Sequence, residues 1–410
     1  MSTALQRERL PFSLACGAAV AGFVSIAASH LLLGAAILSL ARRRDLLRPP
    51  PGWILLGLFC VLTVASAAVS GHFAEALPQI KKFYVFLLLP VVYSAVRKPA
   101  DVQRMFVWMA AAATASAAWS MVQYVFKLRA AEEAGVPFYQ AYVADRITGF
   151  MSHWMTFSGH MMIGLALLAG IVLFASPAGW GRREWLACSA GGALMAAGLV
   201  LGLTRSMWAG AGAAALYLVW NWRKRLILAA PLAAAGAFLA APEPLATRIR
   251  SFWQPSPLDS NDHRTILRRT GVRMIEANPW FGVGPMRVRE TFLDYLPPDV
   301  PRPLPVSYWY DHLHNIYIHF AAERGIPAML ALVGFLAAGL VRMAARARDA
   351  PADVRAVLHA ASACIVGVLV AGWGEVNLGD SEVLGVVLSV IAGALSAISD
   401  PAGAASAPVR

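Results

Sequence analysis

Long apolar runs constrain this chain more than any other feature of its sequence. Runs of about 17 or more apolar residues recur along its 410 residues, and a helix of that length crosses the hydrocarbon core of a bilayer. Only 14% of the residues are charged, against about 25% in an average soluble domain. The sequence therefore predicts an all-α, polytopic membrane protein.

The apolar runs divide into about twelve predicted spans. The run over 11–41 is too long for one untilted helix, so it is predicted to form a hairpin of two helices interrupted near Ser29 and His30. The remaining spans are predicted at 53–70, 83–96, 103–125, 154–175, 185–203, 206–220, 226–241, 313–340, 353–373 and 382–398.

The placement of Lys and Arg predicts the orientation of these spans. Cytoplasmic loops of membrane proteins carry an excess of basic residues, and long loops cross the membrane largely regardless of charge. With the N-terminus in the cytoplasm, six short basic segments fall on the cytoplasmic side: 1–10, 42–48, 97–104, 182–183, 223–225 and 342–355. Both termini are then cytoplasmic.

This topology divides the chain into four parts. They are residues 1–241, with nine spans and an outward segment at 127–149; residues 242–312, a large periplasmic loop; residues 313–400, with the last three spans; and residues 401–410, a cytoplasmic tail. The first run lacks an A-x-A cleavage site and is expected to be a retained helix.

Charge and cysteine content exclude some function classes. The formal charge of +12 is distributed among loops by the predicted topology, so lipids or an anionic substrate fit better than nucleic acid as partners. The four cysteines occur singly inside apolar runs, with no zinc-binding spacing, and are interpreted as small core residues. No Walker motif is present, so neither ATP nor any other cofactor is expected.

The large loop is predicted to be ordered. Leu267 and Met274 lie at helical spacing within a helix over 262–278, which Asn278 and Pro279 end. Five prolines over 297–305 rule out a helix there and predict a stiff strap. That strap is expected to bring the aromatic residues Tyr308, Trp309 and Tyr310 to the membrane interface.

Three histidines follow this strap, where the chain re-enters the membrane. His312, His314 and His319 fall within eight residues, and a neutral imidazole can take a proton from a sugar hydroxyl, a contribution of about 10²–10⁴-fold. Alternatively each caps a helix or bonds a carbonyl. The residues alone do not separate His312 from His314 as the base. A metal site has little support, because only Asp311 and Glu323 are nearby carboxylates.

Arginines are the candidate anion-binding residues. Arg264 and Arg268 are i,i+4 neighbours on the predicted loop helix, and such cations repel unless an anion lies between them. Arg264 lies near the helix N-terminus, which favours anions, and is the stronger candidate. Arg287 is a further candidate in the same loop, and Arg205 lies between two apolar runs. The alternatives are a solvated basic face in the loop and snorkelling of Arg205.

Several other polar residues have two open interpretations. Glu323 and Arg324 form either a buried pair or a helix-end feature. His153 and His160 share a helix face and either line a cavity or pack, with packing favoured. Lys81 and Lys82 either add positive charge to a site or anchor the chain at the interface.

Two motifs resemble a known family. His314-Asn315, followed after nine residues by Gly325-Ile-Pro-Ala328, resembles the H-N-x9-G-x-x-G/A signature of bacterial O-antigen ligases, with Ala328 as a mild departure. Arg264 and the later Asn278-Pro279-Trp280-Phe281-Gly282-Val283-Gly284 are similar to a segment of the wider O-antigen ligase/polymerase (Wzy-C) superfamily. The twelve-span layout with one large outward loop agrees with this resemblance.

The resemblance implies a metal-independent, inverting glycosyltransferase of the GT-C class. It would transfer a glycan from undecaprenyl pyrophosphate to the lipid A–core oligosaccharide, at the periplasmic face of the bacterial inner membrane. By position, His314 would be the catalytic base, and Arg205 and Arg264 would bind the pyrophosphate. The alternatives are an O-antigen polymerase, a protein O-oligosaccharyltransferase, or, in a different class, a lipid or glycan transporter.

Overall fold

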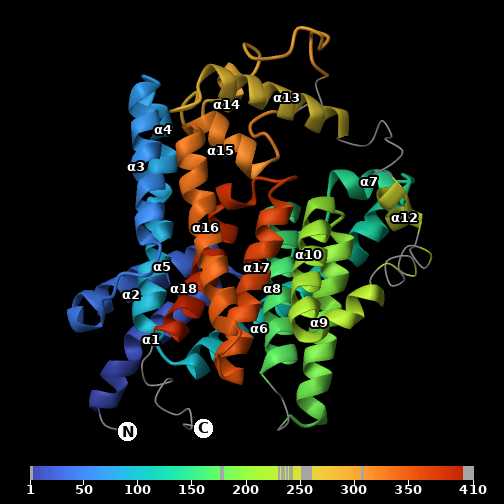
Figure 1. Cartoon of the computed structure of the whole chain (residues 1–410). Helices are drawn as coiled ribbons and strands as arrows, with labels where there is room; N and C mark the ends of the chain where they lie inside the picture. The colour runs from blue at the N-terminus through green and yellow to red at the C-terminus, as the bar shows by residue number, and fades with distance from the viewer. Residues whose placement is uncertain are drawn as a thin grey trace.

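The computed structural model describes residues 3–175, 180–229, 243–250, 261–305 and 309–399, together with residues 231, 236 and 239. All regular elements in these ranges are helices, so the all-α prediction is confirmed. Figure 1 shows long helices packed side by side, with α13 and α14 lying across one end of the bundle.

The helix bounds follow the predicted runs closely in most places. The elements are α1 (Thr3–Ala21), α2 (Ile26–Ala41), η1 (Arg44–Leu46), α3 (Trp53–Val69), α4 (Phe73–Lys81), η2 (Lys82–Leu87), α5 (Leu88–Ala95), α6 (Pro99–Glu133), α7 (Phe138–Ala144), α8 (Trp154–Phe174), α9 (Arg182–Leu201), α10 (Arg205–Arg223), η3 (Lys224–Ala229), α12 (Glu243–Arg250), α13 (Asn261–Ala277), α14 (Val288–Thr291), α15 (Ile316–Arg324), α16 (Ile326–Ala347), α17 (Ala352–Ala371), η4 (Asn377–Gly379) and α18 (Ser381–Ile398).

Seven helical segments in the described ranges are long and apolar enough to cross a membrane. They are Phe73–Ala95, Pro99–Glu133, Trp154–Phe174, Arg182–Leu201, Ile326–Ala347, Ala352–Ala371 and Ser381–Ile398. Three shorter apolar helices, Arg9–Ala21, Ile26–Ala41 and Trp53–Val69, add to them. The chain is therefore a membrane protein, and the number of twelve spans stays a prediction. Most of the predicted span at 226–241 lies outside the described residues.

The first hairpin forms, but its turn is not where the sequence predicted. The chain turns between Ala21 and Ile26, and the Ser25 side chain caps α2 by accepting from the amide of Ala28 at 3.3 Å. Ser29 instead lies inside α2, where its hydroxyl donates to the carbonyl of Ala18 at 2.7 Å. This polar residue joins the two helices because a buried hydroxyl needs an acceptor.

The outward segment predicted at 127–149 is largely helical. Helix α6 continues through it to Glu133, because its sequence there consists of good helix formers, and α7 follows. Tyr124 of α6 contacts Phe138 and Tyr142 of α7, with ring centroids 5.5 and 5.3 Å apart. Aromatic packing therefore fixes α7 against the end of α6.

The span predicted at 313–340 is broken in two. Gly325 separates α15 from α16 with a φ of 87°, a left-handed conformation that favours glycine. A Cβ at Gly325 would also collide with the carbonyl of Trp280. The amide of Ile326 donates to the carbonyl of Pro279 at 2.8 Å, so the Asn278–Gly284 segment is fastened to this break.

The large loop has a small apolar core of its own. Leu267 and Met274 of α13 are fully buried, as their helical spacing predicted, and they pack with Phe292, Leu296 and Leu313. The proline-rich stretch is not helical in its described residues, as predicted. Tyr308 lies outside the described residues, so the membrane-interface role of the aromatic group stays a prediction. This core holds α13 against the start of α15.

Candidate functional site

A buried carboxylate lies at the centre of the candidate site. Glu375 follows α17, and its side chain is only 3% exposed. Its Oε1 accepts from Nη2 of Arg264 at 2.5 Å, and its Oε2 lies 2.8 Å from Nδ1 of His314. Three segments far apart in the sequence, α13, the approach to α15 and the end of α17, therefore meet at one side chain.

Backbone contacts explain why His314 and Glu375 meet. The Asn315 side chain caps α15 by accepting from the amides of Tyr317 and Ile318, both at 3.0 Å. Its amide nitrogen donates to the carbonyl of Trp373 at 3.1 Å. The amide of Ile316 donates to the carbonyl of Gly372 at 2.8 Å. The His-Asn pair is therefore one unit, in which the asparagine ties the histidine's segment to the end of α17.

His314 is held in an unusual backbone conformation. Its φ of 45° lies in the left-handed region, which costs a non-glycine residue about 1–3 kcal/mol and is concentrated at functional sites. Because the Glu375 carboxylate accepts, the imidazole donates from Nδ1, and the neutral ring then has a free lone pair on Nε2. That nitrogen can accept a proton from a substrate.

Charge around Glu375 keeps the carboxylate ionised. Burial alone would raise the pKa of Glu375, but electrostatic attraction and hydrogen bonds from Arg264 and His314 lower this pKa to about 2. Arg264 also donates from Nη1 to the carbonyl of Gly374. A Cβ at Gly374 would crowd this guanidinium at 3.2 Å, so a residue without a side chain lets Arg264 approach. Arg264 is therefore held rigidly, with its side chain 22% exposed.

Two further histidines pack beside His314. The rings of His312 and His314 lie 4.4 Å apart between centroids, and those of His263 and His314 lie 6.4 Å apart. Burial, and secondarily the neighbouring His314, lowers the pKa of His312 to about 3 and that of His263 to about 4. Both rings are therefore neutral near neutral pH. His319 belongs elsewhere, since its Nε2 lies 3.8 Å from the buried carboxylate of Glu323.

One group of side chains here could hold a metal ion. Ligand atoms of His312, His314 and Glu375 all lie within 4.8 Å of one another, which is a donor set suited to an ion such as Zn²⁺. Sequence reasoning considered only Asp311 and Glu323 as carboxylates for such a site. Glu375 supplies one from 61 residues beyond His314. Both of its oxygens are engaged by Arg264 and His314, and the expectation of a metal-independent protein stays a prediction.

Arg205 begins α10 next to this cluster. The hydroxyl of the adjacent Ser206 lies 3.5 Å from Oε1 of Glu375, so the N-terminus of α10 reaches the same carboxylate. Three of the predicted positions, Arg205, Arg264 and His314, are therefore brought to one place. A helix N-terminus beside arginines favours a bound anion.

Two more arginines lie near this helix end, and sequence reasoning did not select them. Arg146 and Arg248 are both buried and both donate to the carbonyl of Leu203, at 3.5 and 3.3 Å. Burial, and then the like charge of Arg248, lowers the pKa of Arg146 to about 10. Its guanidinium also stacks over Trp154 at 5.1 Å. Their only sequence signal was position, since Arg146 lies in the outward segment 127–149 and Arg248 lies in the loop 242–312.

Two predicted arginines contact other groups. Arg268 is exposed and donates to the carbonyl of Arg264 within its own helix at 3.4 Å. Arg287 is paired with Glu75 of α4 at 2.6 Å. Among the described contacts, neither touches Glu375 or His314, so the structure does not bring these two to the cluster.

Contacts decide two of the remaining open interpretations. Glu323 and Arg324 form a buried pair, 3.3 Å apart. His153 caps α8 by accepting from the amide of Met155 at 3.2 Å, and His160 packs against Phe23 with centroids 4.8 Å apart. Both histidines of α8 therefore have structural roles, as the packing interpretation favoured.

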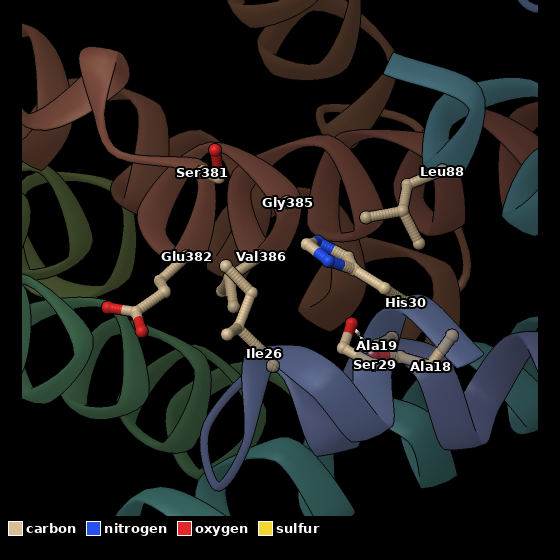
Figure 2. A pocket seen from close by; sticks show the side chains of 11 residues that line it. Ala18, Ala19, Ile26, Ser29, His30, Leu88, Ser381, Glu382, Gly385 and Val386 are labelled. Atoms are coloured by element: carbon tan, nitrogen blue, oxygen red, sulfur yellow. Dashed lines mark hydrogen bonds between the residues drawn. The ribbon is translucent and has the colours of Figure 1, made fainter. Parts of the chain in front are cut away.

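A separate recess lies between α1, α2, α5 and α18. It is an open hollow of about 240 Å³, part of it solvent space, and is lined by side chains that include Ser29, His30, Leu88 and Glu382. Figure 2 shows the Glu382 carboxylate pointing away from the His30 ring. No predicted site residue lines this recess, so it is distinct from the cluster around Glu375.

Comparison with known families agrees with the two sequence motifs. Residues 190–333 match the family described as O-antigen ligase (Wzy_C). These residues are similar to an O-antigen ligase domain. The resemblance to the O-antigen ligase/polymerase superfamily is thereby confirmed. The matched stretch contains Arg205, Arg264 and His314, whereas Glu375 follows it. No curated protein matches the chain.

Proposed function

We propose that this protein is an O-antigen ligase of the bacterial inner membrane. It would transfer a glycan from undecaprenyl pyrophosphate to the lipid A–core oligosaccharide, with its site facing the periplasm and both termini in the cytoplasm. The observation that carries the proposal is the contact of one carboxylate, Glu375, with both Arg264 and His314. This contact supports the proposal because it brings the guanidinium proposed to bind the anion close to the imidazole proposed to accept the proton.

The reaction assigns one task to each group. Nε2 of His314 takes the proton of the acceptor hydroxyl as its oxygen attacks the anomeric carbon of the donor sugar. The bond from that carbon to the pyrophosphate oxygen breaks, and the electron pair leaves with the pyrophosphate. Glu375 stabilises the imidazolium that forms, because its carboxylate accepts from Nδ1. Direct attack by a single acceptor inverts the anomeric carbon.

The leaving pyrophosphate requires positive charge. Arg264 and Arg205 would bind it, together with the N-terminus of α10, which Arg205 begins. Arg146 is a further candidate, since it is a buried cation within electrostatic reach of Glu375. Arg268 and Arg287 would then contribute only to the general field, because their described contacts lie elsewhere.

One substitution tests the proposal. In cells producing His314→Ala, a ligase predicts lipopolysaccharide without O-antigen on gels, with polymerised glycan accumulating on its lipid carrier. Lipopolysaccharide with a single repeat would identify a polymerase instead. Loss of glycan from a glycoprotein, with normal lipopolysaccharide, would identify a protein O-oligosaccharyltransferase. Unchanged glycosylation would contradict every enzymatic assignment and favour a transporter.

A further inference from the structure

A second recess lies against α15, and none of its lining residues is assigned to the reaction. It is an open hollow of about 410 Å³, part of it solvent space, between α3, η2, α15 and the start of α18. Its apolar wall includes Phe59, Phe83, Phe86, Phe320, Leu332 and Leu384. The rings form a continuous series, since Phe59 lies 5.9 Å from Phe86 and 5.7 Å from Phe320 between centroids. Such a wall accommodates hydrocarbon.

The polar groups of this recess are cationic or neutral. Arg324 and Lys82 line it together with Gln79, and no acidic side chain is among its described lining residues. The guanidinium of Arg324 lies 5.2 Å from the ring centroid of Phe59 and 4.9 Å from that of Phe320. A hydrocarbon-compatible wall and two cations therefore share one cavity.

Arg324 is buried and incompletely satisfied. Only 5% of the residue is exposed, and Nη2 lies 3.3 Å from Oε2 of Glu323 and 3.5 Å from Oε1 of Gln79. Its Nε is buried with no hydrogen-bond partner among the described residues. A buried donor without a partner costs about 1–3 kcal/mol, so an acceptor atom in the recess would be stabilising.

Lys82 supplies the second charge. It is exposed, lies inside the candidate membrane span Phe73–Ala95, and forms no ion pair with any side chain that the structure describes. An ionisable residue within a membrane span marks a functional site by default, because it is costly to place there. The net charge of Arg324, Lys82 and the neighbouring Glu323 is positive.

We propose that this recess binds a phosphate-bearing membrane lipid, with the phosphate at Lys82 and Arg324 and the start of the tail against the phenylalanine wall. A lipid fits this recess better than a free anion does, because apolar side chains make up more of its lining than polar groups do. The site is independent of the proposed transfer reaction, since none of its lining residues belongs to the Glu375 cluster.

Lipid titration of the purified, delipidated full chain, read by native mass spectrometry, tests this proposal. Phosphatidylglycerol is expected to bind the wild-type protein. Lys82→Gln should lower its affinity about five-fold, since a basic residue near a lipid phosphate contributes about 1 kcal/mol. The matched control is Lys81→Gln, because Lys81 is the adjacent exposed lysine and does not line the recess. Equal affinity in the Lys82 and Lys81 variants would overturn the proposal.

Two further binding experiments distinguish the contribution of the lipid phosphate from that of the lipid tails. Diacylglycerol with the same tails should bind more weakly, and Lys82→Gln should not change its binding. Inorganic phosphate at millimolar concentration should not displace phosphatidylglycerol, and displacement would overturn the lipid assignment. The amide of Met286 donates to the Glu323 carboxylate at 2.7 Å. In Glu323→Gln the side-chain amide oxygen still accepts this hydrogen bond, but no carboxylate neutralises the charge of Arg324. This substitution should raise phosphatidylglycerol affinity, and lower affinity in a variant of unchanged thermal stability contradicts the role of Arg324.

The His314→Ala variant distinguishes this proposal from the proposed function. It should bind phosphatidylglycerol as the wild type does, whatever its effect on lipopolysaccharide. A parallel loss of lipid binding in that variant would show that the two sites are one and would overturn the independence of the recess.

Discussion

Glu375 and His314 are joined by a hydrogen bond of 2.8 Å, although 61 residues separate them in the chain. The carboxylate orients the ring, determines which nitrogen carries the proton and offers a counter-charge for a protonated imidazole. The same carboxylate holds Arg264, so one side chain couples the proposed base to the proposed anion-binding group.

Replacement of Glu375 by Gln tests this coupling. The amide keeps the size of the side chain but removes the charge that stabilises the imidazolium and holds Arg264. Ligation should fall about 10–100-fold, the usual cost of losing a group that orients a reactive histidine. Quantification of O-antigen-bearing lipopolysaccharide measures it. Full activity in a correctly inserted Glu375→Gln protein would remove Glu375 from the mechanism.

Replacement of Arg264 by Lys tests bidentate recognition of the pyrophosphate. Lysine keeps the charge but not the planar fork that engages two oxygens, so activity should drop by at least about ten-fold. Arg268→Lys is the matched control, because Arg268 lies one turn along the same helix and is exposed. Equal activity of the two variants would favour a solvated basic face.

The pH dependence of stability should reflect His312 and Glu375. The folded-state pKa of His312 is lowered from 6.5 to about 3, so below pH 6.5 the unfolded chain binds a proton that the folded protein excludes. Stability therefore falls as pH drops from 6.5 towards 3, by about 1.4 kcal/mol per pH unit for one fully coupled group. The folded-state pKa of Glu375 is lowered from 4.5 to about 2, so this residue adds a further loss of stability only below about pH 4.5.

Thermal unfolding in detergent between pH 5 and pH 7.5 checks this dependence. The wild-type midpoint should decrease towards pH 5, and His312→Gln should show a shallower decrease because one of the excluded protons is removed. His263→Gln, at the neighbouring ring with its pKa lowered to about 4, should act in the same direction. Identical slopes in all three proteins would exclude these rings as the cause.

Zinc should inhibit without being required. Chelation by EDTA is expected to leave ligation unchanged, whereas Zn²⁺ should compete for His312, His314 and Glu375 and remove the proton acceptor. His312→Gln should weaken the inhibition by zinc, because it removes one of the three ligands. This variant keeps His314 and Glu375, the residues that are assigned to the reaction. Dose–response curves for ligation in membranes give both results. Loss of activity with EDTA, restored by a metal ion, would contradict a metal-independent reaction.

Gly325→Ala tests the break between α15 and α16. The added Cβ would enforce a positive φ on alanine and collide with the carbonyl of Trp280, so the Asn278–Gly284 segment should be displaced. We expect a loss of about 1–3 kcal/mol of stability, with reduced ligation. The control is Gly57→Ala on α3, where a Cβ meets open space and the helix should tolerate it. Comparison of thermal unfolding midpoints measures the difference.

The sequence was sufficient for the features that depend on local composition. Apolar runs located α3, α8, α17 and α18 within a residue or two, because burial in lipid requires a continuous apolar helix. Leu267 and Met274 were placed in a core by spacing alone. The motif around His314 and Asn315 indicated the superfamily, and the domain match agrees with it.

Local pattern could not locate the breaks and turns that depend on tertiary contacts. Residues 313–340 are apolar over most of their length, so the sequence predicted one helix. The break at Gly325 combines a left-handed φ with the close approach of Trp280, and that approach is visible only in the tertiary structure. The hairpin turn before α2 was misplaced for a similar reason. Ser29 looked like a turn residue, but its hydroxyl is satisfied by Ala18 across the helix interface.

By itself, the sequence determined that the chain is a helical membrane protein with a basic, histidine-rich loop, because hydropathy and charge are properties of each segment alone. It also nominated His312, His314, Arg205 and Arg264. Residue type alone did not separate the two histidines, and the resemblance of the His314-Asn315 motif favoured His314. Only the tertiary structure placed Glu375 against His314 and Arg264. A hydrogen bond between residues 61 positions apart depends on how α15 and α17 are tied together, which no local pattern encodes.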